Sequence, residues 1–322
     1  MRSFANKIPK IEETNITVKN LLKISICVVL LFLSPCWPCC SLHAQASADG
    51  EAVLRMLALQ ERLDVAPSRQ EVKQIIGEMA ATGTVSAYKT IELCATHPRL
   101  RAYANRLMKR MLKQHPELEG YTSLFNGSDL SGWKGLVENP IVRSRMSADE
   151  LAAAQAKADE QMRKDWKVEG GLIVYVGNGY DNLCTARQYG DFELCLDWRL
   201  DPSGKEPDAG IYLRGTPQVQ IWDTARTDVG AEVGSGGLYN NQKNPSKPIC
   251  VADRKTGEWN NFYIRMVGDR VTVWLNGVLV VDNVVLENYW DRSRPIFPRE
   301  QIELQAHGSK VYYRNIYIKE LE

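Results

Sequence analysis

The stretch VTVWLNGVLVVD, residues 271–282, decides the fold class because it encodes a β-hairpin. Two runs rich in β-branched residues flank Asn276-Gly277, and Asn-Gly favours the two-residue turn that joins antiparallel strands. Comparable short runs rich in Val, Ile, Tyr and Trp recur along the chain, at residues 172–176, 191–199, 210–214, 218–223, 260–267, 301–306 and 311–319. Many short strands without alternating helices predict an all-β sandwich or barrel.

Upstream of this β-rich part, the sequence predicts short helices. Apolar residues recur close to helical spacing in four segments, which Pro67, Gly83 and Pro98 separate. We therefore expect a small helical domain over residues 47–118, followed by a β-rich domain over residues 119–322. No residue cluster in the helical part suggests chemistry.

One helix interrupts the β-rich part. Ser147-Ala-Asp-Glu150 is a capping box, and Ala, Gln, Lys and Glu dominate the residues that follow as far as Lys164. The sequence therefore predicts a helical insertion over about residues 147–165, packed on the edge of the sandwich.

The N-terminal residues have the features of a signal peptide. Lysines precede an apolar run at residues 24–33, which is too short to span a bilayer. Ala44-Gln45-Ala46 fits the small-x-small cleavage rule, so we expect residues 1–46 to be removed. The mature protein is then exported, to the periplasm, with no membrane span. Lipidation at Cys36 is less favoured, because Pro35 occupies the small-residue position of a lipobox.

Charge and cysteine content exclude two classes of function. The net charge is +1 and Lys and Arg form no stripe beyond the N-terminus, which argues against nucleic-acid binding. Outside the signal peptide, the cysteines are widely spaced and include no Cys-x-x-Cys pair; they are Cys94, Cys184, Cys195 and Cys250. That is no zinc pattern, and we expect free buried thiols, although export permits a disulfide.

The stretch QIELQAHG, residues 301–308, combines core and site features. Ile302, Leu304 and Ala306 alternate with polar residues, as in a strand that has one buried face. The polar side chains are a carboxylate, an amide and an imidazole, from Glu303, Gln305 and His307. Such a row forms either a solvated face or one wall of a site.

Several motifs in a fixed order together identify a family resemblance. They are SLFNGSDLSGW (123–133), YGDFEL (189–194), AGIYLRG (209–215), VQIWD (219–223), GSGGLYNNQ (234–242), GEWNNFYI (257–264) and VWLNGVLVVD (273–282). This combination resembles the 3-keto-disaccharide hydrolase family over about residues 121–321. Ala209 is a small departure, because relatives often carry Ser there.

The resemblance implies a concanavalin A-like jelly-roll sandwich that acts on 3-keto-disaccharides or other 3-keto-glycosides. A sugar 3-dehydrogenase would then have to supply the ketone, and the chain itself would need no nicotinamide. We predict no cofactor, and a divalent metal requirement is left open. Asp181 and Asp208 are expected in turns, where acidic residues sometimes bind Ca²⁺, but no clustered ligand set supports such a site.

In a jelly-roll sandwich the outward residues of three strands would line one concave face, provided that these strands are neighbours. The outward sets are Tyr212 and Arg214, then Gln218, Gln220 and Trp222, then Glu303, Gln305 and His307, with Asp223 at a strand end. The glycine-rich loop at 234–241 would add Tyr239, Asn240 and Asn241 at the rim. By the same alternation, Glu193 and Asp197 are expected in solvent on the opposite sheet.

These residue types suit a sugar. Aromatic rings of Trp222 and Tyr212 stack on a pyranose, while Gln220, Gln305 and Arg214 bond hydroxyls or polarise a ketone. Glu303 and His307 are the predicted proton-transfer residues, and Asp223 is the next acidic candidate. Each assignment has a plainer alternative: a solvated strand face, or an Arg214–Glu303 pair across strands.

Two reaction routes and one non-catalytic role remain open at this point. A C3 ketone acidifies the C2 hydrogen, so a base can remove it, the C1 substituent leaves by elimination, and water adds later. Direct displacement at C1 by two carboxylates is the conventional alternative. A carbohydrate-binding jelly-roll module without catalysis is the alternative function, because the fold alone does not decide it.

Overall fold

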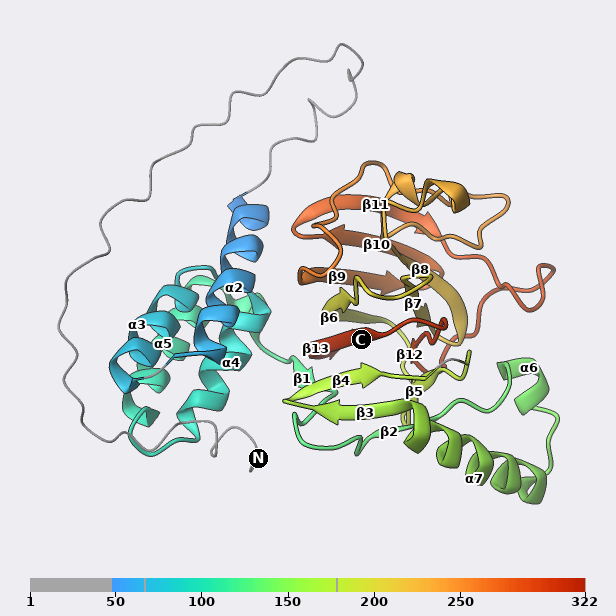
Figure 1. Ribbon diagram of the computed structural model, residues 1–322, viewed down its shortest axis with the longest axis horizontal. Coiled ribbons are helices and arrows are strands. Elements are labelled where there is room, and N and C mark those ends of the chain that lie inside the picture. The colour runs from blue at the N-terminus through green and yellow to red at the C-terminus, as the bar shows by residue number, and fades with distance from the viewer. Residues whose placement is uncertain (1–47, 67, 178, 322) are drawn as a thin grey trace, which may run out of the picture.

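A computed structural model describes residues 48–66, 68–177 and 179–321, and the signal-peptide prediction lies outside these residues. The described chain has a helical part and a two-sheet part, which lie side by side in Figure 1. None of the helices described has the length and apolar composition needed to cross a membrane.

The helical part consists of four α-helices and a 3-10 turn. They are α2 (Ala48–Asp64), α3 (Arg69–Ala80), α4 (Val85–Ala95), α5 (Arg101–Gln114) and η1 (Pro116–Leu118). Ser68 and Thr84 cap α3 and α4, because their hydroxyls accept hydrogen bonds from backbone N–H groups of the first turn. Ile76, Ile91 and Met111 are fully buried at the centre of a separate apolar core.

The β-rich part is a sandwich of two antiparallel sheets. The large sheet has the order β11-β10-β9-β6-β13-β4-β3, with β1 also paired to β13, and the small sheet has the order β2-β5-β12-β7-β8. The strands are β1 (Thr122–Ser123), β2 (Trp133–Gly135), β3 (Trp166–Glu169), β4 (Leu172–Tyr175), β5 (Leu183–Thr185), β6 (Phe192–Leu200), β7 (Asp208–Leu213), β8 (Thr216–Trp222), β9 (Asn260–Val267), β10 (Arg270–Leu275), β11 (Val278–Val285), β12 (Glu303–Leu304) and β13 (Val311–Glu320). This is the predicted jelly-roll type of sandwich.

The predicted hairpin and inward residues are confirmed. Leu275 pairs with Val278 across a two-residue turn, in which Asn276 and Gly277 both have positive φ. The inward side chains of β7, β8 and β12 join one apolar core between the sheets; they include Ile211, Leu213, Val219, Ile221 and Leu304. Regular pairing of the 301–306 stretch is limited to β12, which is shorter than the predicted strand.

Two helices adjoin the small sheet. The capping box at Ser147 and Glu150 opens α7 (Ala148–Asp165), as the sequence predicts. α7 lies against β2, the edge strand of the small sheet, where the Gln155 side chain donates to the Gly135 carbonyl at 2.9 Å. The four-residue helix α6 (Pro140–Arg143) follows β2 and precedes α7.

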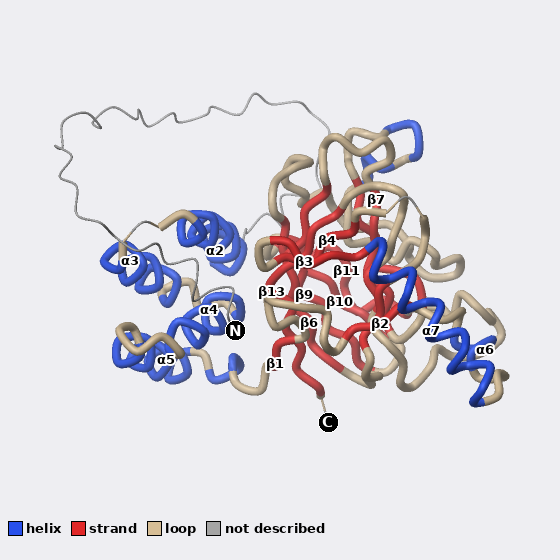
Figure 2. Tube along the Cα trace, turned by 60° about the horizontal axis from the view of Figure 1, so that its bottom comes forward, coloured by secondary structure: helices blue, strands red, loops and turns tan. Residues whose placement is uncertain are grey.

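The helical part covers the outer face of the large sheet (Figure 2). The Tyr121 hydroxyl donates to Glu193 of β6 at 2.7 Å, and Arg314 of β13 bonds Asp64 of α2 at 3.2 Å. This corrects the expectation that Glu193 and Asp197 point into solvent. Asp197 is only 1% exposed, because the helices cover it and Arg314 pairs with its carboxylate.

Cys94, Cys184 and Cys195 are free thiols, as expected. These three are buried, and Cys250 is half-buried. Burial raises the pKa of the Cys94 thiol to about 11, which keeps it protonated and unreactive at neutral pH.

Candidate functional site

The small sheet brings the three predicted strands together. β12 pairs with β7, and β7 pairs with β8, so the assumed adjacency is correct. Glu303 lies directly opposite Tyr212, while Gly210 lies opposite Gln220. Because residues directly opposite on neighbouring strands share a face, these side chains point to the same side of the sheet, away from the core.

This outward surface, called the polar face below, is defined by the side chains of Asn182, Asp208, Tyr212, Gln218, Gln220, Glu303, Gln305 and His307. A solvated strand face does not describe it: Glu303 is 1% exposed and Gln220 is 2% exposed. Burial of so many polar groups requires a network of partners or a ligand, because unpaired buried polar atoms cost free energy.

Glu303 is the most deeply buried carboxylate of the polar face. The Asn182 side chain donates to its Oε2 atom at 3.0 Å. Burial raises the pKa of Glu303 to about 7, while the Asn182 bond and the Arg143 cation lower it and the Glu300 charge raises it. A carboxyl that titrates near neutrality can give or take a proton under physiological conditions.

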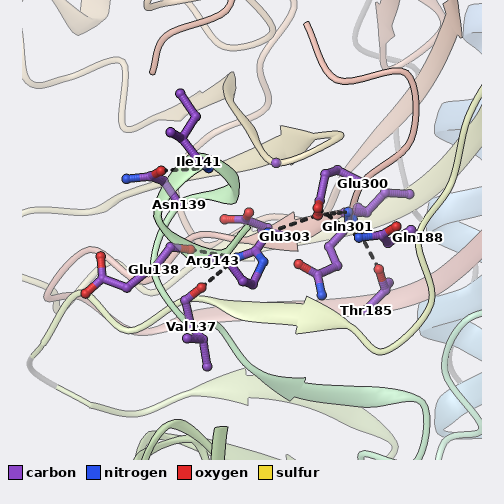
Figure 3. Close-up of polar contacts among 12 residues, drawn as sticks. Val137, Glu138, Asn139, Ile141, Arg143, Thr185, Gln188, Glu300, Gln301 and Glu303 are labelled. Carbon is purple, nitrogen blue, oxygen red and sulfur yellow. Dashed lines mark hydrogen bonds and ion pairs between the residues drawn. The ribbon is translucent and has the colours of Figure 1, made fainter. Parts of the chain in front are cut away.

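Arg143 and Glu300 form an ion pair beside Glu303 (Figure 3). Arg143 Nη2 bonds Glu300 Oε2 at 2.9 Å, and its Nη1 donates to the carbonyls of Val137 and Glu138 at 2.6 and 2.7 Å. The Gln188 side chain donates to the second oxygen of Glu300 at 2.8 Å. These bonds fix the cation of α6 against the small sheet.

Asp208 and His307 form the second ionisable group. His307 Nδ1 lies 3.8 Å from Asp208 Oδ2, and Gln220 Nε2 donates to Asp208 Oδ1 at 2.7 Å. Burial raises the pKa of Asp208 to about 6, against the lowering effect of His307 and of the Gln220 bond. The exposed Tyr180 ring makes an edge contact with the His307 ring at 5.3 Å between centroids.

The polar face keeps atoms without partners. Gln305 Oε1 and His307 Nδ1 are buried and make no hydrogen bond to the described residues. Gly210 lies beneath Gln305, and a Cβ there would meet Gln305 Oε1 at 2.9 Å and Gln218 Cδ at 3.0 Å, so the two glutamine side chains occupy the space above this glycine. The unpaired Gln305 and His307 atoms are the ones that a ligand or water would have to satisfy.

Two sequence-predicted residues do not join the polar face. Arg214 follows the end of β7 with φ of 48°, and its side chain pairs with Asp191 at 3.5 Å and donates to the Pro298 carbonyl. It is therefore turned away from Glu303. Asp223 accepts hydrogen bonds from the Thr256 hydroxyl at 2.6 Å and the Ala225 backbone, which makes it a loop-fixing residue.

Residues of the glycine-rich loop divide into two kinds. Tyr239 is half exposed and makes an edge contact with Trp222, which lies opposite Asp208 at the end of β8. Asn241 is buried and bonds the carbonyls of Pro245 and Val285, and Asn240 accepts from Arg292 through its carbonyl. The Asn241 amide is thus occupied within the loop, contrary to the expectation that it faces a ligand.

The sequence reasoning missed two members of the polar face. Gln218 was predicted as an outward residue of its strand, so the missed members are Asp208 and Asn182, and Asp208 was expected in a turn but begins β7. Asn182 precedes the three-residue strand β5, which is too short for a periodic signal. Among the described residues, no group of three or more His, Cys, Asp or Glu side chains is placed to hold a metal ion.

A family model described as a 3-keto-alpha-glucoside-1,2-lyase-like domain matches residues 120–319. The chain belongs to this family. The match covers both sheets of the sandwich and the whole polar face, and it excludes helices α2 to α5. Membership places this lyase-like domain among carbohydrate-active proteins, and it supports an enzyme that acts on glycosides.

The solved structures that resemble the lyase-like domain have low sequence identity to it and low TM-scores. One candidate glycosyl hydrolase from Parabacteroides distasonis ATCC 8503 is 24% identical, over 64% of this chain and 96% of its own, with a TM-score of 0.48. A second one from the same organism is 21% identical, over 62% of this chain and 99% of its own, with a TM-score of 0.44. Carbohydrate binding module CBM66 from Bacillus subtilis is 12% identical over 59% of this chain and 96% of its own, with a TM-score of 0.33. Scores this low say nothing about activity, and no curated protein matches the chain.

Arg143 offers a test of the electrostatics at Glu303. Arg143→Gln removes a cation that lowers the Glu303 pKa, so we expect that pKa to rise further. The measurement is a ¹³C NMR titration of the Glu303 carboxyl, compared between wild type, Arg143→Gln and Arg143→Lys. Arg143→Lys keeps the positive charge, so the Glu303 pKa in this variant should stay close to the wild-type value. An unchanged Glu303 pKa in Arg143→Gln would show that the Arg143 cation does not lower it.

Proposed function

We propose that the lyase-like domain cleaves 3-keto-glycosides by elimination, with the polar face as its active site. One observation carries the proposal: two carboxyl groups whose pKa values lie near neutrality, Glu303 and Asp208, share one buried face with unpaired amide and imidazole atoms. Elimination needs a base at C2 and an acid at the glycosidic oxygen, and two such groups on one face supply both.

The two carboxyls take different roles because their surroundings differ. Glu303, with the pKa of about 7, keeps its proton longer and acts as the acid that protonates the leaving oxygen. Asp208, with the pKa of about 6 and His307 beside it, ionises first and removes the C2 proton, the imidazole accepting or relaying that proton.

Neutral donors near Glu303 stabilise the enolate that forms when the C2 proton leaves. The C3 oxygen gains negative charge, and the amide of Gln305 and the hydroxyl of Tyr212 are the donors proposed for it. Tyr212 lies opposite Glu303, and the buried phenol has a raised pKa, so it stays protonated and can donate. Tyr239, which is half exposed and contacts the buried Trp222 at the end of β8, offers a ring surface for a pyranose.

Incubation of the purified protein with 3-keto-glucosides in D₂O tests the proposal. Cleavage with deuterium at C2 of the product, followed by NMR and mass spectrometry, is the expected result. The control is the substrate alone in the same buffer, which corrects for spontaneous exchange beside the ketone. An unsaturated product with no hydrogen at C2 would also be the elimination product, before water adds. A saturated product that keeps hydrogen at C2 would favour direct displacement by two carboxylates.

No cleavage of α- or β-linked 3-keto substrates, with and without a divalent metal, would overturn the enzyme and favour a carbohydrate-binding module. In the proposed setting, residues 1–46 export the protein to the periplasm, and a sugar 3-dehydrogenase supplies the ketone. A mass-spectrometric search of a periplasmic fraction for the N-terminus Ser47 tests the export step.

A further inference from the structure

A pocket of about 420 Å³ lies between the helical part and the outer face of the large sheet. Side chains of α2, η1, β6, β9 and β10 line it. It is on the opposite side of the sandwich from the polar face, because β6, β9 and β10 belong to the other sheet. Ligand sites of this size are frequent where two domains meet.

The sheet wall of this interdomain pocket has an aromatic row with polar rows on both sides. Tyr263 lies opposite Trp274 across β9 and β10, with ring centroids 5.0 Å apart. Asp197 pairs with Asn261 in the row on one side, and Glu193 pairs with Arg265 in the row on the other. A sugar binds to such a surface: its ring packs on the aromatic side chain, and its hydroxyl groups form hydrogen bonds with the carboxylate and amide groups beside it.

The carboxylates on the sheet wall of the interdomain pocket already have partners. Asp197 pairs with Arg314 at 3.3 Å, and Glu193 pairs with Arg265 at 3.5 Å. A charged ligand would therefore meet no free counter-charge among these groups. The opposite wall, from α2, is apolar, with Val53, Met56 and Leu57.

We propose that the interdomain pocket is a second ligand site, and that it takes a neutral sugar ring stacked on Trp274, with the Tyr263 ring, which is inclined to Trp274 by 44°, against the edge of the sugar. Carboxylate and amide oxygens of Glu193 and Asn261 accept from its hydroxyl groups, and the α2 side chains cover its apolar edge. The helical part is then one wall of a binding site, which gives a function to the residues outside the family match.

Two tryptophans report the two faces separately. Trp274 is in the interdomain pocket, and Trp222 is at the polar face. The protein is labelled with 5-fluorotryptophan, and the Trp274→Phe and Trp222→Phe variants assign the two ¹⁹F resonances. Methyl glucosides, sucrose, maltose and lactose are titrated as uncleavable probes, since they carry no ketone. We expect at least one of them to move the Trp274 resonance along a saturable curve.

Ala52→Phe fills the pocket from the α2 wall without altering the sheet, and Ala58→Phe is the matched control on the exposed side of the same helix. Affinity read at Trp274 should fall at least tenfold in Ala52→Phe and stay unchanged in Ala58→Phe. A shift at Trp222 alone, or equal binding at Trp274 in both variants, would overturn the proposal. Turnover is not measured, so failure here is independent of the function proposed for the polar face.

Discussion

Glu303→Gln is expected to lower kcat on a 3-keto-glycoside by about 10²–10⁴-fold, the usual contribution of a positioned acid or base. Gln keeps the shape and still accepts the hydrogen bond from Asn182, but it has no proton to give. In the wild type, activity should fall as pH rises through about 7, because Glu303 loses its proton there. That decrease should be absent from the residual activity of the variant.

The stability of Glu303→Gln distinguishes a lost acid from a damaged fold. The folded-state pKa of about 7 exceeds the reference value of 4.5, so burial favours the protonated form and wild-type stability falls as pH rises between these values. The gap corresponds to about 3 kcal/mol. Thermal unfolding at alkaline pH should therefore give a higher Tm for Glu303→Gln than for wild type.

Below about pH 3.5, where Glu303 is protonated in both the folded and the unfolded state, the variant and wild type should unfold alike. Glu232→Gln, at an exposed position of the 3-10 helix Ala231–Val233, is the matched control and should change neither kcat nor Tm. If Glu303→Gln is less active and also less stable than wild type at alkaline pH, Glu303 has a structural role and is not the catalytic acid.

Asp208→Asn is the second substitution expected to reduce kcat by about 10²–10⁴-fold. Asn keeps the oxygen that accepts from Gln220 but loses the carboxylate that acts with His307. Wild-type activity should rise as pH increases through about 6, where Asp208 ionises, which gives a bell-shaped profile together with the loss near 7. The rising limb should disappear in Asp208→Asn.

Asp223→Asn is the matched comparison for this second prediction. Asp223 holds Thr256 and the Ala225 backbone, so its substitution should change kcat by less than about tenfold. The measurement is the pH dependence of kcat and kcat/KM for wild type and both variants. A larger loss in Asp223→Asn than in Asp208→Asn would return Asp223 to the site and exclude Asp208 as the base.

Strand periodicity predicts most of the sandwich because long strands carry an alternating pattern. β6, β9 and β13 are eight to ten residues long and coincide closely with the predicted runs. β2 and β5 have three residues each, and no period can be read from so few positions. The missed strands matter, because β5 and the residues before it bring Asn182 to Glu303.

Candidate residues were predicted where alternation alone decides the direction of a side chain. Glu303, Gln220 and Tyr212 point outward as expected, because each lies within a paired strand. Arg214 departs from the pattern because the strand ends one residue earlier, and a positive φ turns its side chain toward Asp191. Alternation therefore predicts side-chain direction only within a paired strand, and it fails for Arg214, one residue beyond the end of β7.

By itself, the sequence determined the two-part organisation, the sandwich, the hairpin at Asn276-Gly277 and the family, because each depends on local patterns or ordered motifs. Only the tertiary structure decided which ionisable groups meet. Asp208 and His307 are 99 residues apart by their numbering, and their 3.8 Å approach arises from strand order in the small sheet. The pKa values near neutrality have the same origin, since burial by distant segments, rather than neighbours in sequence, is the largest cause of each shift.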